Sequence, residues 1–163
     1  MNILVLADTH IPDFAKALPA AMYGALRRVD LILHAGDVTC VEVLEELSSF
    51  APVQAALGNN DGPSVRAWGA REEVELELNG TVVSMVHDAG PRRGREGRMR
   101  RRFPRADLLV FGHSHIPIDS LAEGVRLFNP GSPTWKRRQP APTYGLITIG
   151  PGRVHTQIME LPA

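Results

Sequence analysis

"NILVLADTH" (residues 2–10) joins an unbroken apolar run to a polar end, and the same combination recurs along the chain. A continuous apolar run of this length is typical of a strand that is buried on both faces of a sheet. "DLILHA" (30–35) and "PVQAAL" (52–57) repeat the run. Three such runs in the first third of the chain predict neighbouring buried strands.

Helical patterns separate these runs. Pro19 suits the first turn of a helix that reaches about Arg28. Thr39 and Glu42 have the spacing of a capping box, which predicts an amphipathic helix through Leu47. The alternation of strand and helix predicts parallel strands with helices packed outside them.

The remainder of the chain has the pattern of a second sheet. Asn79-Gly80 between two strand-like runs is a strong hairpin signal. A short arginine-rich helix is expected over 95–103, because Pro104 ends it. "NPGSPTWKRRQPAP" (129–142) is expected to be an irregular loop. The strands expected here are 74–78, 81–87, 106–111, 125–129, 144–150 and 153–161.

Composition predicts one globular domain over residues 1–163, with 44% hydrophobic and 22% charged residues. The formal net charge is zero, so the molecule as a whole does not attract nucleic acid or membranes. Cys40 is the single cysteine, which excludes an intrachain disulfide and a cysteine-rich zinc site. No apolar run could span a bilayer, and the features of a signal peptide are missing. We therefore expect a cytoplasmic protein without a membrane partner.

Metal-competent side chains follow five of the expected strands. In open α/β sheets, sites form in the crevice beyond the carboxyl ends of the strands, so these side chains should converge. Two pairs are spaced two residues apart, and in an extended backbone such residues project to the same side. The candidates are Asp8, His10, Asp37, Asn59, His87, His113 and His115.

Seven candidate ligands exceed the four to six that one ion needs, which favours two divalent ions sharing a carboxylate. Imidazole, carboxylate and amide groups without a thiolate favour Mn, Fe, Zn, Co or Ni over the oxygen-only sites of Ca or Mg. Mn²⁺ is the first candidate, and Mg²⁺ is kept as an alternative.

The ordered motifs "DTH", "GD", "GNND", a single histidine and "GHSH" resemble the calcineurin-like metallophosphoesterase family, particularly its small single-domain bacterial and archaeal phosphodiesterases. "FNPGSPT" (128–134) adds to the likeness. The resemblance implies an α/β fold, a four-layer α/β/β/α sandwich with two mixed sheets. It also implies a dinuclear metal centre that activates a bridging hydroxide for in-line attack on a phosphate ester. A diester is favoured over a monoester, with nucleotide or nucleic-acid derivatives as candidate substrates.

Carried over residue by residue, the resemblance implies a division of the ligands between two ions. The first ion would be held by Asp8, His10 and His115, and the second by Asn59, His87 and His113, with Asp37 bridging them.

Two positions depart from the family pattern. Asn60 stands where many relatives carry a histidine that protonates the leaving group, and an amide can donate a hydrogen bond but cannot deliver a proton. We expect Asp61 to orient Asn60 as a neighbouring partner. Asp88 follows His87 where relatives commonly have glycine, and it adds negative charge beside the expected phosphate pocket.

The segment 91–105 contains eight arginines and leaves two interpretations open. We favour a solvated helix face whose guanidinium stems cover apolar surface. The alternative is a basic patch over 92–105 that binds nucleic acid. Under either interpretation the first arginines follow closely after His87, so Arg92 and Arg93 are the candidates for contact with the substrate phosphate at the rim of the site. A second alternative function is a non-catalytic protein-interaction scaffold, as in the retromer subunit built on this fold. A homo-oligomer is compatible with the sequence, but nothing in it requires one.

Overall fold

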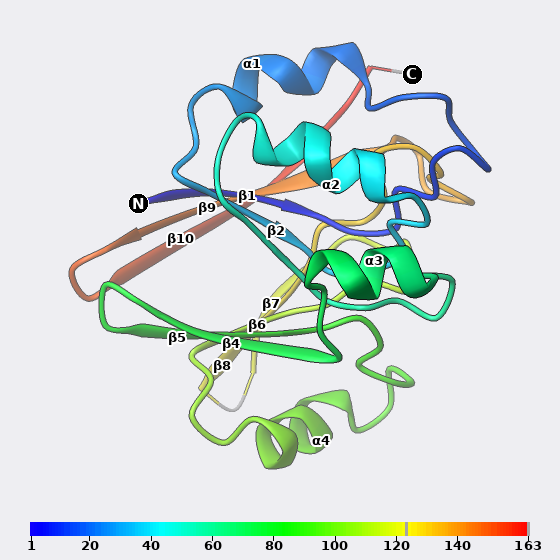
Figure 1. The fold of residues 1–163 in the computed structure, drawn as a ribbon. Coiled ribbons are helices and arrows are strands. Elements are labelled where there is room, and N and C mark those ends of the chain that lie inside the picture. Colours follow the sequence, from blue (N-terminus) through cyan, green and yellow to red (C-terminus); the bar gives the residue numbers. More distant parts are fainter. Residues whose placement is uncertain (123, 163) are drawn as a thin grey trace.

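The computed structural model describes residues 1–122 and 124–162, and its strands form two stacked five-stranded sheets (Figure 1). The first sheet has the order β10-β9-β1-β2-β3, and the second has the order β4-β5-β6-β8-β7. The strands of the first sheet are β1 (Asn2–Leu6), β2 (Leu31–His34), β3 (Val53–Ala55), β9 (Thr143–Gly150) and β10 (Arg153–Glu160). Those of the second are β4 (Glu73–Leu78), β5 (Thr81–Val86), β6 (Leu108–Val110), β7 (Ile118–Ala122) and β8 (Val125–Asn129).

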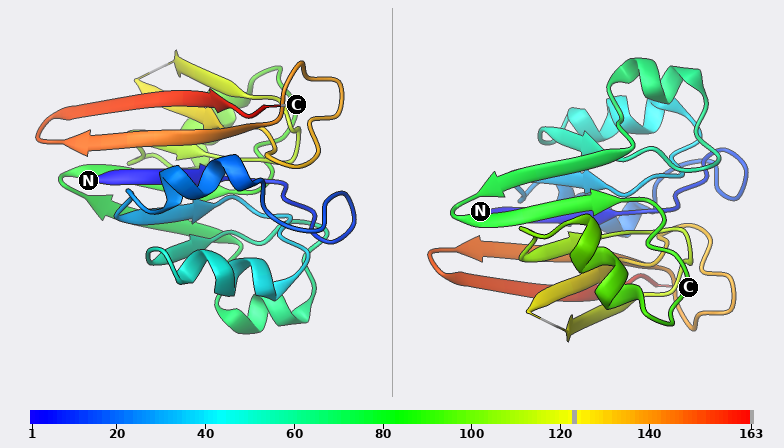
Figure 2. Two further views of the ribbon diagram at one scale, coloured as in Figure 1. Left: turned by 90° about the horizontal axis from the view of Figure 1, so that it is seen from above. Right: turned by 90° about the horizontal axis from the view of Figure 1, so that it is seen from below.

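Helices cover the two outer faces, which completes the four-layer α/β/β/α sandwich that was expected (Figure 2). The first sheet is covered by α1 and α2, and the second sheet is covered by α4. Among the described residues, no helix is both long enough and apolar enough to cross a membrane. The helices are the 3₁₀ turn η1 (Ala20–Met22), α1 (Tyr23–Leu26), α2 (Val41–Ser48), α3 (Pro63–Trp68) and α4 (Arg95–Arg102).

The alternation of β1 side chains between two cores explains its unbroken apolar run. Leu4 and Leu6 point into the core beneath the helices, whereas Ile3 and Val5 point into the core between the sheets. A third core, which includes Phe103, fills the space between the second sheet and α4. Three apolar cores therefore hold four layers together.

The parallel pairing of β1 with β2 and of β2 with β3 brings the carboxyl ends of these strands to one edge. In the second sheet β5 pairs parallel with β6. The loop after β6 meets the loop after β5, because the amide of Gly112 donates a hydrogen bond to the carbonyl of His87 (2.9 Å). The loops that carry the candidate ligands therefore share one edge of the sandwich.

The capping-box prediction at Thr39 is wrong. The N-cap of α2 is Cys40, and no side chain caps the helix there. Thr39 instead has a left-handed backbone (φ 69°), and its hydroxyl donates to the carbonyl of Ile11 (2.5 Å). The local spacing of Thr39 and Glu42 is overridden by a tertiary contact with the loop after β1.

Two elements were not predicted because each lacks an apolar run. Helix α3 is six residues long, and strand β7 is an edge strand whose side chains are half-buried or exposed. The expected helix from Pro19 is shorter than predicted and ends at Leu26. His34 on β2 is fully buried in the core, and burial lowers its pKa to about 3.

We expect Gly145→Ala to lower the free energy of unfolding by about 1–3 kcal/mol, the usual cost of overpacking a core. Gly145 faces Phe128 and Val5 between the two sheets, and an added methyl group would lie 2.7 Å from Cζ of Phe128. Urea unfolding measures the change. Gly150→Ala in the same strand is the matched control, because its methyl group would meet no atom within 4 Å. Equal stability of the two variants would refute the close approach of the sheets at this point.

Candidate metal centre

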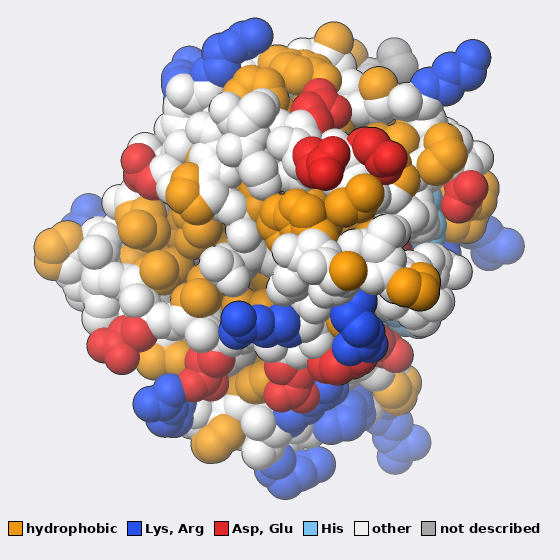
Figure 3. Space-filling view, viewed as in Figure 1, with side chains coloured by type: hydrophobic (Ala, Val, Ile, Leu, Met, Phe, Trp, Pro, Cys, Tyr) orange, Lys and Arg blue, Asp and Glu red, His pale blue; other side chains and the backbone are white. Residues whose placement is uncertain are grey.

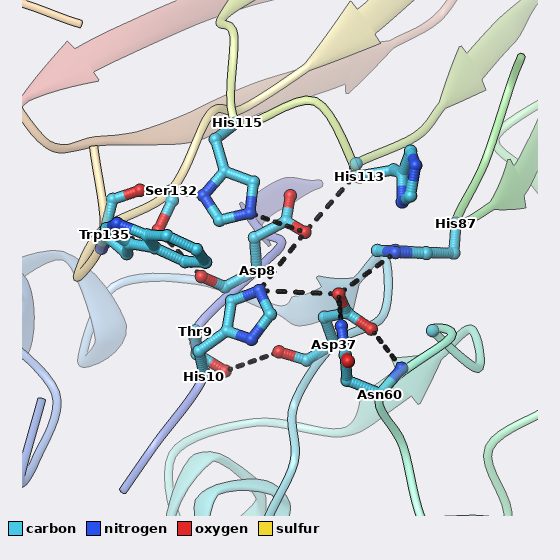
Figure 4. A network of polar contacts seen from close by, with 12 residues as sticks. Asp8, Thr9, His10, Asp37, Asn60, His87, His113, His115, Ser132 and Trp135 are labelled. Carbon is cyan, nitrogen blue, oxygen red and sulfur yellow. Dashed lines mark hydrogen bonds and ion pairs between the residues drawn. The ribbon is translucent and has the colours of Figure 1, made fainter. Parts of the chain in front are cut away.

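The loops after β1, β2, β3, β5 and β6 bring all seven predicted ligand residues to one edge of the sandwich. Figure 4 shows six of them facing a common space. The amide of Asp8 donates to the carbonyl of Gly36 (2.9 Å), which ties the first loop to the second. The amide of His113 donates to Oδ1 of Asp8 (3.2 Å), which ties the loop after β6 to the same carboxylate.

Asp8, His10 and His115 form the first group, and all three are buried. Nε2 of His115 lies 3.4 Å from Oδ1 of Asp8, and Nε2 of His10 lies 3.9 Å from it. Within the described chain, Oδ2 of Asp8 and Nε2 of both histidines have no hydrogen-bond partner. Buried polar atoms without partners are costly, and one candidate ligand atom from each of these three residues lies within 4.8 Å of the others, so the group indicates a place for a cation.

Asp37 joins this group to a second one. Its Oδ2 lies 3.4 Å from Nε2 of His10 and 3.4 Å from Nε2 of His87. Oδ1 of Asn59 contacts Nε2 of His87 (3.1 Å) and Nδ1 of His113 (3.0 Å). The two groups therefore contain the residues that the family resemblance divides between two ions, with Asp37 between them.

Carbonyl groups set the tautomers of two of the histidines. Nδ1 of His87 lies 2.7 Å from the carbonyl oxygen of Ala35, and Nδ1 of His115 lies 2.7 Å from that of Trp135. A carbonyl oxygen can only accept, so both Nδ1 atoms carry the proton. When the ring is neutral, each Nε2 then presents a lone pair to the centre, which is the form of histidine that binds a metal. The residues present fit a divalent ion on this ground.

The paired residues converge, but not for the reason the sequence suggested. Asp8 (φ 55°), His10 (43°), His113 (67°) and His115 (58°) all have left-handed backbones, as does Asp37 (56°). The expectation of an extended backbone is therefore wrong. Such conformations cost about 1–3 kcal/mol each in non-glycine residues and cluster at functional sites. The five strained positions mark this edge as one that the fold holds in place for a purpose other than stability.

Burial dominates the electrostatics of the two carboxylates. Burial raises the pKa of Asp8 to about 7, and the nearby charge of Asp37 adds to the rise. Burial would also raise the pKa of Asp37, but the contact with His87 and two hydrogen bonds from Asn60 hold it below its usual value. Burial lowers the pKa of His115 to about 4, so this ring stays neutral at pH 7. Burial would also lower the pKa of His87, but its contact with Asp37 and the nearby charge of Asp8 raise that pKa above its usual value. The metal-free centre therefore combines the ionised Asp37 with a neutral His115 and with a His87 that favours its protonated form, and a bound cation would displace that proton.

Asn60 and Asp61 both form hydrogen bonds with the loop after β2. Asp61 was expected to orient Asn60, but its carboxylate binds backbone amides instead. Nδ2 of Asn60 donates to Oδ2 of Asp37 (2.7 Å), and its backbone amide donates to Oδ1 (2.9 Å). The Asp61 carboxylate accepts hydrogen bonds from the backbone amides of Gly58 (2.7 Å), Asp37 (3.0 Å) and Thr39 (2.8 Å). Its carboxylate is thus occupied with holding two loops together, and Asn60 is oriented by Asp37 instead.

The loop 129–142 is hydrogen-bonded to the loop after β1. Oγ of Ser132 donates to the carbonyl of Asp8 (2.7 Å), and Oγ1 of Thr134 donates to that of Thr9 (2.5 Å). Together with the Trp135 carbonyl on His115, these contacts support the first group of ligands. Sequence reasoning missed their role, although the motif "FNPGSPT" marked the segment.

Arg92 and Arg93 do not line the cavity beside the second group of ligands, and their contact with the phosphate stays a prediction. This cavity of about 410 Å³ adjoins Asn59, His87 and His113, and it is also lined by Arg102, Asp88 and Glu72. Arg92 lines another hollow together with Ser114, which lies between His113 and His115 in the sequence. Asp88 does lie beside the ligands as expected.

Most of the arginine-rich segment is engaged within the fold. Arg102 pairs with Glu73 (2.6 Å), and Arg105 pairs with Glu75. Arg98 donates to four backbone carbonyls, and the two shortest of these hydrogen bonds reach Pro91 (2.7 Å) and Ala89 (2.9 Å). Figure 3 shows the resulting mixture of basic and acidic side chains over β4 and α4. These contacts favour the structural interpretation of the segment over a nucleic-acid patch.

The chain is similar to known proteins both in sequence and in fold. Residues 1–152 match the model of the calcineurin-like phosphoesterase superfamily domain. A protein named "Probable metallophosphoesterase" from Methanothermobacter thermautotrophicus is 40% identical over 141 residues, which cover 84% of this chain and 80% of that protein. A protein named as a phosphodiesterase from Methanocaldococcus jannaschii is 24% identical over 144 residues, which cover 80% of this chain and 83% of that protein. A crystal structure of Vps29 from Entamoeba histolytica has a TM-score of 0.80 at 22% identity, covering 99% of this chain and all of that one, a likeness in fold alone.

We expect Asp8→Asn to stabilise the metal-free protein at alkaline pH. Folding raises the pKa of Asp8 from 3.8 to about 7. The folded state therefore binds a proton more tightly than the unfolded state, and stability falls as pH rises between these values. The neutral amide removes that loss, on the order of a few kcal/mol at pH of about 8. Urea unfolding in a chelator at about pH 8 and about pH 4 measures it, and the gain should vanish at the lower pH.

The exposed carboxylate Asp13 provides the control, because Asp13→Asn should change stability little at either pH. Adding Mn²⁺ should make the wild type more stable than Asp8→Asn, because a bound ion stabilises the wild type and not the variant. A metal-free Asp8→Asn protein that is less stable than wild type at the higher pH would contradict the electrostatics described above.

Proposed function

The chain belongs to the calcineurin-like phosphoesterase superfamily, and we propose that it is a phosphodiesterase that uses two divalent ions. The observation that carries the proposal is the set of buried, unpartnered ligand atoms on Asp8, His10 and His115, with Asp37 extending the set toward His87. The first ion is assigned to Asp8, His10 and His115, the second to Asn59, His87 and His113, and Asp37 is shared.

Bound divalent ions would supply the positive charge that activates water and stabilises developing charge on phosphoryl oxygens. The protein supplies orientation. Asn60 fixes both oxygens of Asp37, and the carbonyls of Ala35 and Trp135 keep the Nδ1 protons of His87 and His115 away from the centre. These constraints leave little freedom for the groups around the phosphate.

A diester is the favoured substrate because of the charge beside the second group. Asp88 lines the cavity next to Asn59 and His113, whereas the Glu72 carboxylate there is paired with Arg66 (2.6 Å). A diester carries one negative charge at neutral pH, whereas a monoester approaches two, so the Asp88 carboxylate disfavours the monoester. The relative from Methanocaldococcus jannaschii that is named as a phosphodiesterase supports the same preference. Mn²⁺ is the proposed ion, on the mixture of nitrogen and oxygen ligands.

With Mn²⁺ supplied, we expect hydrolysis of an aryl phosphodiester and about two bound ions per chain. His113→Ala and His115→Ala should each retain about one ion, and the double variant none, because the two histidines are assigned to different ions. Elemental analysis of dialysed protein counts the ions, and release of the aryl alcohol measures turnover. Each single variant should lose most of the turnover.

His155→Ala is the matched control, since His155 is exposed on β10, and it should keep both ions and full turnover. Full turnover of the aryl phosphodiester by chelator-treated protein would contradict the proposal. Retention of both ions without turnover of any phosphate ester would instead favour a scaffold function.

Asn60 leads to a further expectation about leaving groups. Because an amide cannot protonate the departing oxygen, the wild type should hydrolyse p-nitrophenyl esters far faster than phenyl esters. Asn60→His offers a proton donor and should raise kcat for the phenyl ester by about tenfold or more while changing the p-nitrophenyl rate less. Asn60→Gln, which also lacks a proton to give, should leave the ratio of the two rates as it was. An unchanged ratio in Asn60→His would show that leaving-group protonation does not limit this enzyme.

A further inference from the structure

An exposed aromatic surface adjoins the first group of ligands. Trp135 stacks on Phe14 with ring centroids 3.6 Å apart and planes 8° from parallel. The ring of His10 lies edge-on to Trp135 at 5.4 Å, and that of His115 at 4.9 Å. Phe14 is 50% exposed and Ile116 is 47% exposed, so large apolar side chains face solvent next to the buried ligands. Figure 4 shows Trp135 beside His115.

Arg137 lies on this aromatic surface. Its guanidinium carbon is 4.6 Å from the centroid of the Trp135 ring. The side chain is exposed, and among the residues described no carboxylate pairs with it, in contrast to Arg102 and Arg105. Its charge is nevertheless felt at Asp8 and His115. An unneutralised cation thus stands within electrostatic reach of the place where the phosphate is expected.

A hollow of about 380 Å³ opens between this surface and the "GHSH" loop. This volume falls within the range of small-molecule sites. Its lining combines an indole, an aliphatic side chain, two guanidinium groups and a carboxamide, a mixture that matches a planar polar ring attached to a phosphate. The lining residues are Ser114, Ile116, Trp135, Arg137, Arg138 and Gln139.

We propose that this hollow is the subsite for a nucleoside attached to the scissile phosphate, with the base stacked on the guanidinium plane of Arg137. Guanidinium planes stack on aromatic rings and on nucleobases, and the Arg137 guanidinium already lies over the Trp135 ring, which leaves its other face for a base. Gln139 can both donate to and accept from the edge of a base. Arg138 adds positive charge that complements the phosphate. The inference rests on the proposed function and narrows its substrate class to nucleotides.

The chain contains two tryptophans, so Trp68→Phe leaves Trp135 as the only indole and makes its fluorescence a direct reporter of the hollow. We expect AMP to change this fluorescence in Mg²⁺-containing buffer and to bind about tenfold more tightly than ribose 5-phosphate, which lacks a base. Arg137→Ala should weaken AMP binding by about tenfold or more. Arg137→Lys keeps the charge and loses the plane, so it should keep ribose 5-phosphate affinity and abolish the preference for AMP.

Arg153→Ala is the matched control, because Arg153 is exposed at the start of β10, at the far end of the first sheet from the ligands. It should leave both affinities unchanged. Equal affinity of the starting protein for AMP and ribose 5-phosphate, or an AMP affinity unchanged in both Arg137 variants, would overturn the inference. The same proteins are assayed with the aryl phosphodiester. Turnover without a preference for AMP overturns the subsite and leaves the proposed function standing. A preference that depends on Arg137, without turnover, supports the subsite and removes the proposed function.

Discussion

Two buried carboxylates share one small space at the ends of β1 and β2, and the rest of the site follows from that constraint. Candidate ligand atoms of Asp8, Asp37 and His87 all lie within 4.8 Å of one another. Like charges so close oppose each other's ionisation, and burial removes the water that would screen them. Backbone carbonyls hold the Nδ1 protons of His87 and His115, so each of these rings, when neutral, turns its Nε2 lone pair toward this space. The two carboxylates favour positive charge in this space, and they raise the pKa of His87 for the same reason. A cation bound there would therefore be stabilised.

Keeping such groups together requires a rigid frame, which the sandwich provides in two ways. Its strands are anchored by three apolar cores, and β1 is buried on both faces. Its loops are tied to one another by polar contacts rather than by regular structure. Asp61 joins three backbone amides of neighbouring loops, and Ser132 and Thr134 hold carbonyls of the loop after β1. These ties hold the left-handed residues in conformations that they would not adopt alone.

The distribution of arginines shows how composition can mislead about function. The helix α4 and its flanks hold the densest positive charge in the sequence, yet Glu73, Glu75 and backbone carbonyls occupy much of it. Arg137, in a loop that reads as irregular, lies on Trp135 without a carboxylate partner among the described residues. The charge available to a substrate is therefore set by local pairing, not by density along the chain.

The sequence by itself determined the layered α/β class and the identity of the candidate ligands. Apolar runs report burial on both faces, and the polar residues that end them sit where parallel strands must bring their carboxyl ends together. Only the tertiary structure decided which residues have left-handed backbones, which amides Asp61 binds, which group Thr39 contacts and that Arg137 lies on Trp135. Each of these depends on contacts between distant segments, such as the hydrogen bond from Ser132 to Asp8 across 124 residues. Local patterns carry hydrophobic periodicity, but they do not record which loops will meet.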